Sequence, residues 1–205
     1  HSYYLIHRES PVITIAIIMK AHPTFESEFL EWDSTRQHKF ITLMHLSNTQ
    51  DAPLVSQLLN LIHACDPSVI HQFITLLITQ WPQHEPPVLA YITDTNRPSH
   101  IRVMLLIQIT QPSCLTDAVL EPLVQCYTNP KDAVIEPIIE AVVDEQPLQL
   151  LPVLIPYVLK PATQLRSQQL LARIGRKTLI QVLGPAKTWP EALVKALENS
   201  PYKSA

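Results

Sequence analysis

The sequence is poor in glycine and in charge. Only 2 of its 205 residues are glycine, whereas 19 are proline. This ratio disfavours sheets joined by tight hairpin turns, because such turns need glycine. Charged residues make up 16% and hydrophobic residues 46% of the chain, which excludes an intrinsically disordered protein. We therefore expect an all-α protein whose helices are separated by proline stops.

Cysteine patterns of disulfide frameworks and of zinc sites are also missing. Cys65, Cys114 and Cys126 are odd in number and lack CxxC spacing, so we expect a reducing, intracellular compartment, cytoplasmic or nuclear. The longest apolar run, Val12 to Met19, is far shorter than the ~20 residues that cross a bilayer. We expect no membrane span in this piece. Because it begins at His1 without a signal pattern, we expect it to be a fragment of a larger protein.

The residue types that catalysis needs do not occur together. The sequence has no glycine-rich phosphate loop, and neither Cys65, which ends a predicted helix near His63, nor Cys126 has an evident partner base. All nine histidines lie at or before position 100, yet none pairs with another at the three- or four-residue spacing of metal ligands. We expect no metal, no cofactor and no enzymatic activity.

Prolines recur at a nearly constant interval. The steps from Pro67 to Pro98, Pro130, Pro161 and Pro190 are 31, 32, 31 and 29 residues, and each proline precedes a run of helical apolar periodicity. Proline fits the first turn of a helix and ends the helix before it. Upstream, the hexapeptide HKFITL at 38–43 is mirrored 33 residues later by HQFITL at 71–76. A period near 30 predicts an array of about six helical hairpins.

The segment 146–174 carries the clearest copy. It contains Leu150-Leu151-Pro152, then Pro161, then Leu165-Arg166 and Leu170-Leu171. In this it resembles a HEAT repeat, in which a proline-kinked first helix precedes a second helix with an arginine near its start. Arg102 matches the same arginine position. Because the repeats are shorter than the ~40 residues typical of the family, an armadillo-like or another helical-hairpin variant stays open.

The resemblance covers residues 24–200 and implies a right-handed α-solenoid of about six HEAT-like hairpins. We expect a single domain over residues 1–205, in which 1–23 form a lead-in segment and first helix and 201–205 form a tail. Helices are expected at residues 11–21, 24–32, 34–47, 51–65, 67–80, 86–94, 98–110, 113–127, 131–145, 146–160, 161–174, 176–183 and 188–199, with a capping-box-like start at Thr188 to Glu191.

Three local features are also predicted. One apolar stripe comprises Leu148, Leu151, Leu154, Ile155 and Leu159, and a second comprises Leu165, Leu170, Leu171 and Ile174. His84-Glu85 is expected in an exposed loop. Pro122, Pro137, Pro152 and Pro156 require helix kinks or places in a first turn.

Charge is unevenly placed along the chain. Residues 103–159 hold seven acidic residues and one basic residue, whereas residues 160–205 hold eight basic and two acidic residues. Opposite charges of this kind suit separate partner sites or head-to-tail contacts. The residues expected to contact a partner are Arg102, Glu136, Glu140, Arg166, Arg173, Arg176 and Lys177. For Arg166, a hydrogen-bond ladder between repeats is the alternative.

These features predict a non-enzymatic scaffold or adaptor domain that binds a protein partner, such as a helix or an extended peptide, within a larger complex. One alternative is a nucleic-acid-binding repeat domain that uses the basic C-terminal repeats, although the formal net charge of −3 disfavours it. The other is a structural domain that self-associates through residues 11–21.

Overall fold

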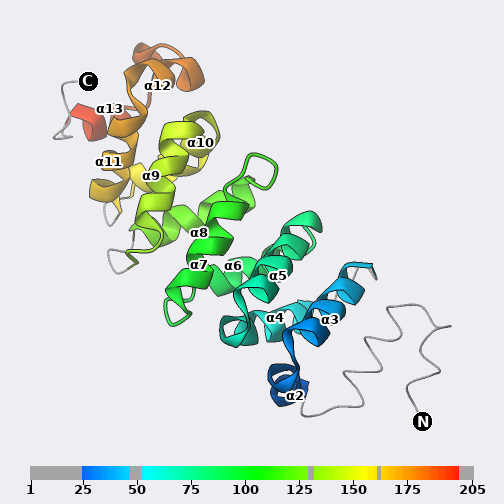
Figure 1. The fold of residues 1–205 in the computed structure, drawn as a ribbon. Helices are drawn as coiled ribbons and strands as arrows, with labels where there is room; N and C mark the ends of the chain where they lie inside the picture. The colour runs from blue at the N-terminus through cyan, green and yellow to red at the C-terminus, as the bar shows by residue number, and fades with distance from the viewer. Residues whose placement is uncertain (1–24, 47–51, 129–131, 161–162, 199–205) are drawn as a thin grey trace, which may run out of the picture. The chain divides into compact units, whose positions relative to one another are not determined.

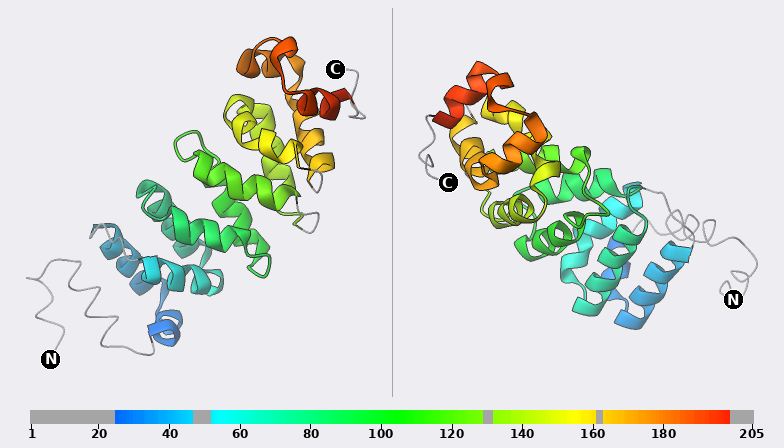
Figure 2. Two further views of the ribbon diagram at one scale, coloured as in Figure 1. Left: turned by 180° about the vertical axis from the view of Figure 1, so that it is seen from behind. Right: turned by 90° about the horizontal axis from the view of Figure 1, so that it is seen from above.

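The structure is a computed structural model that describes residues 25–46, 52–128, 132–160 and 163–198. Within these ranges the regular structure is entirely helical, with twelve α-helices and no strand (Figure 1 and Figure 2). The predicted all-α class is confirmed. Several expected features lie outside the described residues: the lead-in segment, the helix at 11–21, the tail at 201–205 and the prolines at 130 and 161.

The chain divides into two compact units, residues 1–91 and 92–205. Unit 1 contains α2 (Phe25–Glu31), α3 (Ser34–Leu46), α4 (Ala52–Leu61), the short 3-10 helix η2 (Ile62–Ala64) and α5 (Pro67–Thr79). The boundary falls within α6 (Glu85–Thr93). Unit 2 contains α7 (Ser99–Ile109), α8 (Asp117–Thr128), α9 (Glu136–Glu145), α10 (Pro147–Val158), α11 (Gln164–Ile174), α12 (Arg176–Leu183), η3 (Ala186–Thr188) and α13 (Glu191–Glu198). A single domain over the whole chain stays a prediction.

In unit 1, helices from successive hairpins lie side by side: α2 packs beside α4, and α3 beside α5. The mirrored hexapeptides occupy equivalent places, since Phe40 and Phe73 are both buried. The hydroxyls of Thr42 and Thr75 each donate a 2.9 Å hydrogen bond to the carbonyl four residues earlier. The internal match in the sequence is therefore a match in structure.

A compact aromatic cluster fills the start of unit 1. The rings of Phe25, Phe29, Trp32 and Phe40 all lie within 5.4 to 6.1 Å of one another, centroid to centroid. Such spacing is typical of favourable edge-to-face and tilted aromatic pairs. The Arg36 guanidinium lies 4.2 Å from the centroid of the Trp32 ring and covers the cluster from outside.

In unit 2, helices α8 to α13 form two rows (Figure 1). One row contains α8, α10 and α12, and the other contains α9, α11 and α13, with α10 packed against α11. The interior is built from leucine, isoleucine and valine: among others, Leu105, Leu106, Leu123, Val124, Leu150, Leu151, Leu154, Leu170 and Leu171 are buried. Each helix covers its apolar face with helices of the neighbouring hairpin.

Proline and glycine mark the helix ends much as the sequence predicts. Pro67 is the first residue of α5, and the amides of Val69 and Ile70 donate to the Asp66 carbonyl at 2.9 and 3.0 Å. Pro190 directly precedes α13. Gly175 and Gly184, the two glycines of the chain, follow α11 and α12 with φ of 81° and 77°. With ψ of 152° and −168°, both occupy a backbone region that is almost restricted to glycine.

Helices α8 and α9 begin later than predicted, at Asp117 rather than Ser113 and at Glu136 rather than Lys131. Side chains that compete for backbone amides explain the delay. The Thr116 hydroxyl accepts from the Val119 amide at 3.3 Å, and the Asp132 carboxylate accepts from the Val134 amide at 3.2 Å. As a result Pro137 falls in the first turn of α9, whereas Pro122, Pro152 and Pro156 lie inside helices.

Two local predictions at chain turns are wrong. His84 is 1% exposed rather than part of an exposed loop, and its Nε2 is hydrogen-bonded to the Gln80 amide oxygen at 2.9 Å. The Gln80 side-chain amide in turn donates to the His45 carbonyl at 3.1 Å. The buried His84 and Gln80 side chains therefore both have hydrogen-bond partners. Before α13, the Thr188 hydroxyl donates to the Pro185 carbonyl at 2.7 Å instead of forming the expected capping box.

The apolar stripes of α10 and α11 are partly misplaced in the prediction. Leu151, Leu154, Leu170, Leu171 and Ile174 are buried as expected. Leu148, Leu159 and Leu165 are 45%, 41% and 64% exposed. Tyr157 and Val158 lie on the buried side of α10 instead. The helix is therefore rotated about its axis relative to the prediction.

We predict that Gly175→Ala lowers the free energy of unfolding by about 1–3 kcal/mol. A Cβ at this position meets no atom within 4 Å, so the loss comes from the backbone conformation alone. Chemical denaturation of the purified chain measures it, with Gln181→Ala at an exposed position of α12 as the control. Equal stability of the two variants would contradict the assigned backbone conformation.

We also predict that His84 makes the fold sensitive to acid. Burial lowers the pKa of His84 below its ordinary value, so the folded chain binds this proton less readily than the unfolded chain. The contribution to stability is complete above the ordinary pKa of about 6.5 and is lost as the pH falls below it. Melting temperatures at pH 7.5 and 5 should therefore differ more for the wild type than for His84→Gln; an identical difference would refute the role.

Candidate functional site

Four of the seven expected contact residues pair with one another across α9 and α11. Glu136 and Glu140, together with Asp144, recur every fourth residue and share one face of α9, while Arg166 and Arg173 lie seven residues apart on one side of α11. We call these five residues the charged ladder. It is the densest group of ion pairs in the described ranges, and it lies between two helices of the same row.

Arg166 forms the half-buried end of the charged ladder. Its Nη2 lies 2.8 Å from Glu136 Oε1, and its guanidinium carbon lies 4.7 Å from the centroid of the Tyr127 ring on α8. Burial raises the pKa of the Tyr127 hydroxyl, and the neighbouring guanidinium opposes that shift. Arg166 thus connects three helices by one ion pair and one cation–π contact.

Arg173 forms the exposed end and is held by two carboxylates. Its Nε and Nη2 lie 2.7 and 2.6 Å from the two oxygens of Asp144, and its Nη1 lies 2.7 Å from Glu140 Oε2. Hydrogen bonding from this guanidinium lowers the pKa of Asp144. All these side chains are more than a third exposed, and water weakens such pairs. The ladder aligns α9 and α11 more than it stabilises them.

Arg102 lies in the interior and not on the surface where a partner could reach it. It is 2% exposed, its Nε donates to the Ile92 carbonyl at 2.7 Å, and its Nη2 is paired with the buried Asp132 carboxylate. A buried charge is stable only with such partners. The expectation that Arg102 contacts a partner is therefore corrected to a structural role in unit 2.

The two remaining residues begin α12. Arg176 is its first residue and Lys177, which is exposed, its second. The structure thus brings together Glu136, Glu140, Arg166 and Arg173, whereas Arg102 lies in the interior and Lys177 on α12.

The outward face of α10 was missed in the sequence because its leucines were assigned to the core. Leu148, Pro152, Pro156 and Leu159 are exposed and Ile155 is half-buried, and all five lie on one side of the helix. We call this set the α10 face. Proline has no N–H, so the carbonyls of Leu148 and Pro152 lack the usual amide donor four residues later. The feature of the sequence that could have indicated this exposed face is the pair of prolines four residues apart, Pro152 and Pro156.

The exposed positions of the neighbouring helices in the same row are mostly polar on α8 and mixed on α12. On α8 the exposed positions are Asp117, Ala118, Glu121 and Gln125. On α12, Lys177 and Gln181 are exposed beside Ile180 and Val182, which are 41% and 36% exposed. A helix that is apolar on its outer as well as its inner side is typical of a contact surface.

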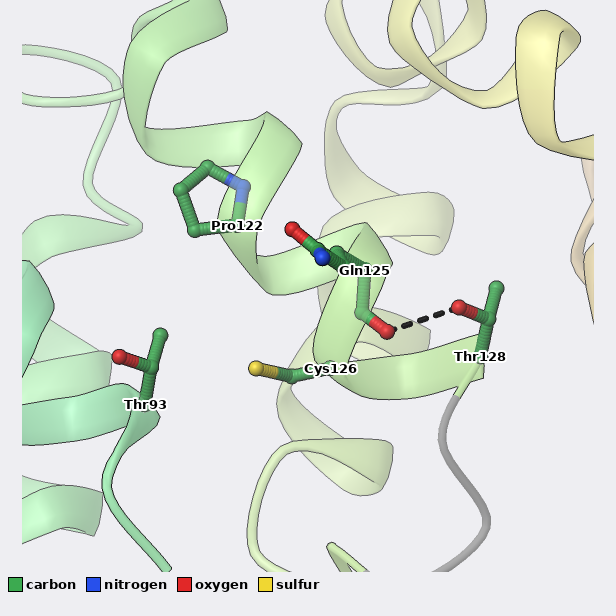
Figure 3. A pocket seen from close by; sticks show the side chains of 5 residues that line it. All are labelled: Thr93, Pro122, Gln125, Cys126 and Thr128. Carbon is green, nitrogen blue, oxygen red and sulfur yellow. Dashed lines mark hydrogen bonds between the residues drawn. The ribbon is translucent and has the colours of Figure 1, made fainter.

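A hollow of about 530 Å³ opens beside α8 and is lined by Thr93, Pro122, Gln125, Cys126 and Thr128 (Figure 3). The Cys126 sulfur points toward the side from which Thr93 comes. Burial and the nearby Asp132 carboxylate raise the pKa of the Cys126 thiol, which therefore stays protonated near neutral pH and is a weak nucleophile. The hollow offers small polar groups but no activated catalytic side chain.

Metal-binding and membrane-spanning features were also sought in the part of the chain that the structure describes. There, no three His, Cys, Asp or Glu side chains gather as a metal site would require, and Cys65, Cys114 and Cys126 are unpaired. None of the helices in the same ranges has the length and apolar character that crossing a bilayer requires.

Comparisons with family models, curated proteins and solved structures found no match to this chain. The resemblance to HEAT repeats is therefore supported by the sequence pattern alone. The helical, repeat-like architecture is supported by the structure.

We predict that the buried and the exposed arginine pairs differ strongly in their contribution to stability. Asp132→Asn leaves the Arg102 charge without a counterion in the interior and should lower the free energy of unfolding by about 3–5 kcal/mol. Asp144→Asn, on the exposed pair with Arg173, should change it far less. Urea denaturation of both variants measures the contrast. A milder effect at Asp132 than at Asp144 would contradict the assigned burial.

Proposed function

We propose that this chain is a non-enzymatic protein-interaction module in which HEAT-like hairpins stack as a right-handed α-solenoid. Polar contacts within each unit support the stacking. They join residues 34 and 35 positions apart in unit 1, and 30, 36 and 29 positions apart in unit 2. These separations lie close to the interval between the prolines. Arrays of this kind offer extended surfaces to protein partners.

The α10 face is the observation that carries the proposal. Leu148 and Leu159 are 45% and 41% exposed at its two ends, and apolar residues lie between them. Exposed apolar side chains gathered on one helix favour burial by another protein, because water is released from both surfaces. A helix that lays its own apolar side along α10 is the simplest fitting partner.

We infer that the charged ladder holds α9 and α11 in register. This role corresponds to the hydrogen-bond ladder between repeats, the alternative given above for Arg166. Glu136, Glu140 and Asp144 already lie against the two arginines and would repel the phosphates of nucleic acid. The protein-interaction proposal is therefore preferred to the nucleic-acid alternative. The unpaired cysteines support a reducing, intracellular setting.

We predict that Leu148→Ser/Leu159→Ser weakens capture of partner proteins at least about tenfold without changing the melting temperature appreciably. Both side chains are largely exposed, so their loss removes contact surface rather than core. Wild type and variant would serve as baits in an extract of the native host, with the bound proteins quantified by mass spectrometry.

A matched control is Ala118→Ser/Gln125→Ser on the exposed side of α8. Equal capture by the α10 variant and the wild type would overturn the proposal for this face. Loss of capture by Arg166→Glu/Arg173→Glu alone, with unfolding unchanged, would place the contact on the charged ladder instead.

A further inference from the structure

The α10 face has the spacing of a helix-pairing seam. Leu148, Pro152, Ile155 and Leu159 follow one another at steps of four, three and four residues. Apolar residues at these steps form the narrow stripe along which one helix packs on another. The spacing therefore specifies a helix as the occupant, in preference to a strand or an extended peptide, whose side chains alternate every second residue.

We propose that the α10 face packs against the α10 face of a second copy of this chain, with the two helices antiparallel. This inference rests on the proposed function and names its partner. The contact is isologous: the same patch is used on both copies, as in the two-fold dimers that dominate among homo-oligomers.

The spacing of the seam, at steps of four, three and four residues, reads the same in both directions. When one helix is reversed, Leu148 of one copy lies opposite Leu159 of the other, and Pro152 lies opposite Ile155. Each opposed pair then occurs twice, so both ends of the seam are closed by two leucines.

Charge at the two ends of α10 favours the antiparallel direction. Glu145, the last residue of α9, is exposed two residues before α10, and Lys160 is exposed two residues after its end. Reversal brings the carboxylate of one copy toward the ammonium of the other at both ends, and it opposes the two helix dipoles. A parallel pair would instead bring like charges together.

The neighbouring helices limit the contact to α10. Asp117 and Glu121 are exposed on α8, which lies beside α10 in the same row (Figure 1). Like charges on two α8 helices would repel if they met.

Three double variants of the full chain test both the contact and its direction. Leu148→Asp/Leu159→Asp and Leu148→Lys/Leu159→Lys place like charges at both ends of the seam, and each should raise the dimer dissociation constant at least about 100-fold. Leu148→Asp/Leu159→Lys places opposite charges opposite each other only in the antiparallel pair, and it should dimerise. Sedimentation equilibrium over a range of concentrations gives the constants, and thermal unfolding verifies that each variant is folded.

A one-to-one mixture of the all-aspartate and all-lysine variants should form a mixed dimer, although each alone is monomeric. If the wild type stays monomeric at every concentration, the inference is refuted. If the mixture dimerises but Leu148→Asp/Leu159→Lys does not, the antiparallel direction is refuted. A monomeric wild type that still captures another protein through Leu148 and Leu159 would refute self-pairing and leave the proposed function standing.

Discussion

Every helix in the described part of this chain depends on neighbours to cover its apolar side. Most are eight to thirteen residues long, a length at which an isolated helix is marginal in water. Burial of side chains such as Phe73, Leu105 and Leu154 therefore supplies the stability. This constraint explains the rows of helices in unit 2, where α10 contacts α8 and α12 in its own row and α11 in the other row. It also explains why prolines are tolerated, since packing offsets the amides they lack.

Polar contacts set the register of neighbouring hairpins. In unit 1, Gln72 on α5 is hydrogen-bonded to His38 and donates to the Thr42 hydroxyl on α3 at 2.9 Å. In unit 2, the buried pair Arg102–Asp132 and the exposed pair Arg173–Asp144 likewise connect neighbouring hairpins. The buried pair is specific because an unmatched charge in the interior is costly, whereas the exposed pair can be replaced by water. Register is thus enforced most strongly where water is excluded.

Proline has a second consequence on α10. Pro152 and Pro156 lie inside the helix on its solvent side, where carbonyls without an amide donor can be hydrated. Leu148 and Leu159 flank them and make the outer side of the helix apolar. Helix α8, on which Asp117, Glu121 and Gln125 are exposed, has no comparable face. The proposed contact surface thus combines a backbone constraint with apolar side chains that lie outside the interior.

The all-helical class, the equivalence of residues 38–43 and 71–76, and the helix boundaries at Pro67 and Gly184 could be predicted from the amino-acid sequence, because these features depend on local backbone chemistry and periodicity. The direction in which each helix faces could not be predicted, because it depends on tertiary packing. Leu148 and Leu159 fit an apolar stripe as well as Tyr157 and Val158 do, and the choice depends on the helices that surround α10. Likewise, Arg102 and Arg173 are alike in sequence, but one is enclosed with Asp132 and the other is solvated, because burial depends on residues some thirty positions away.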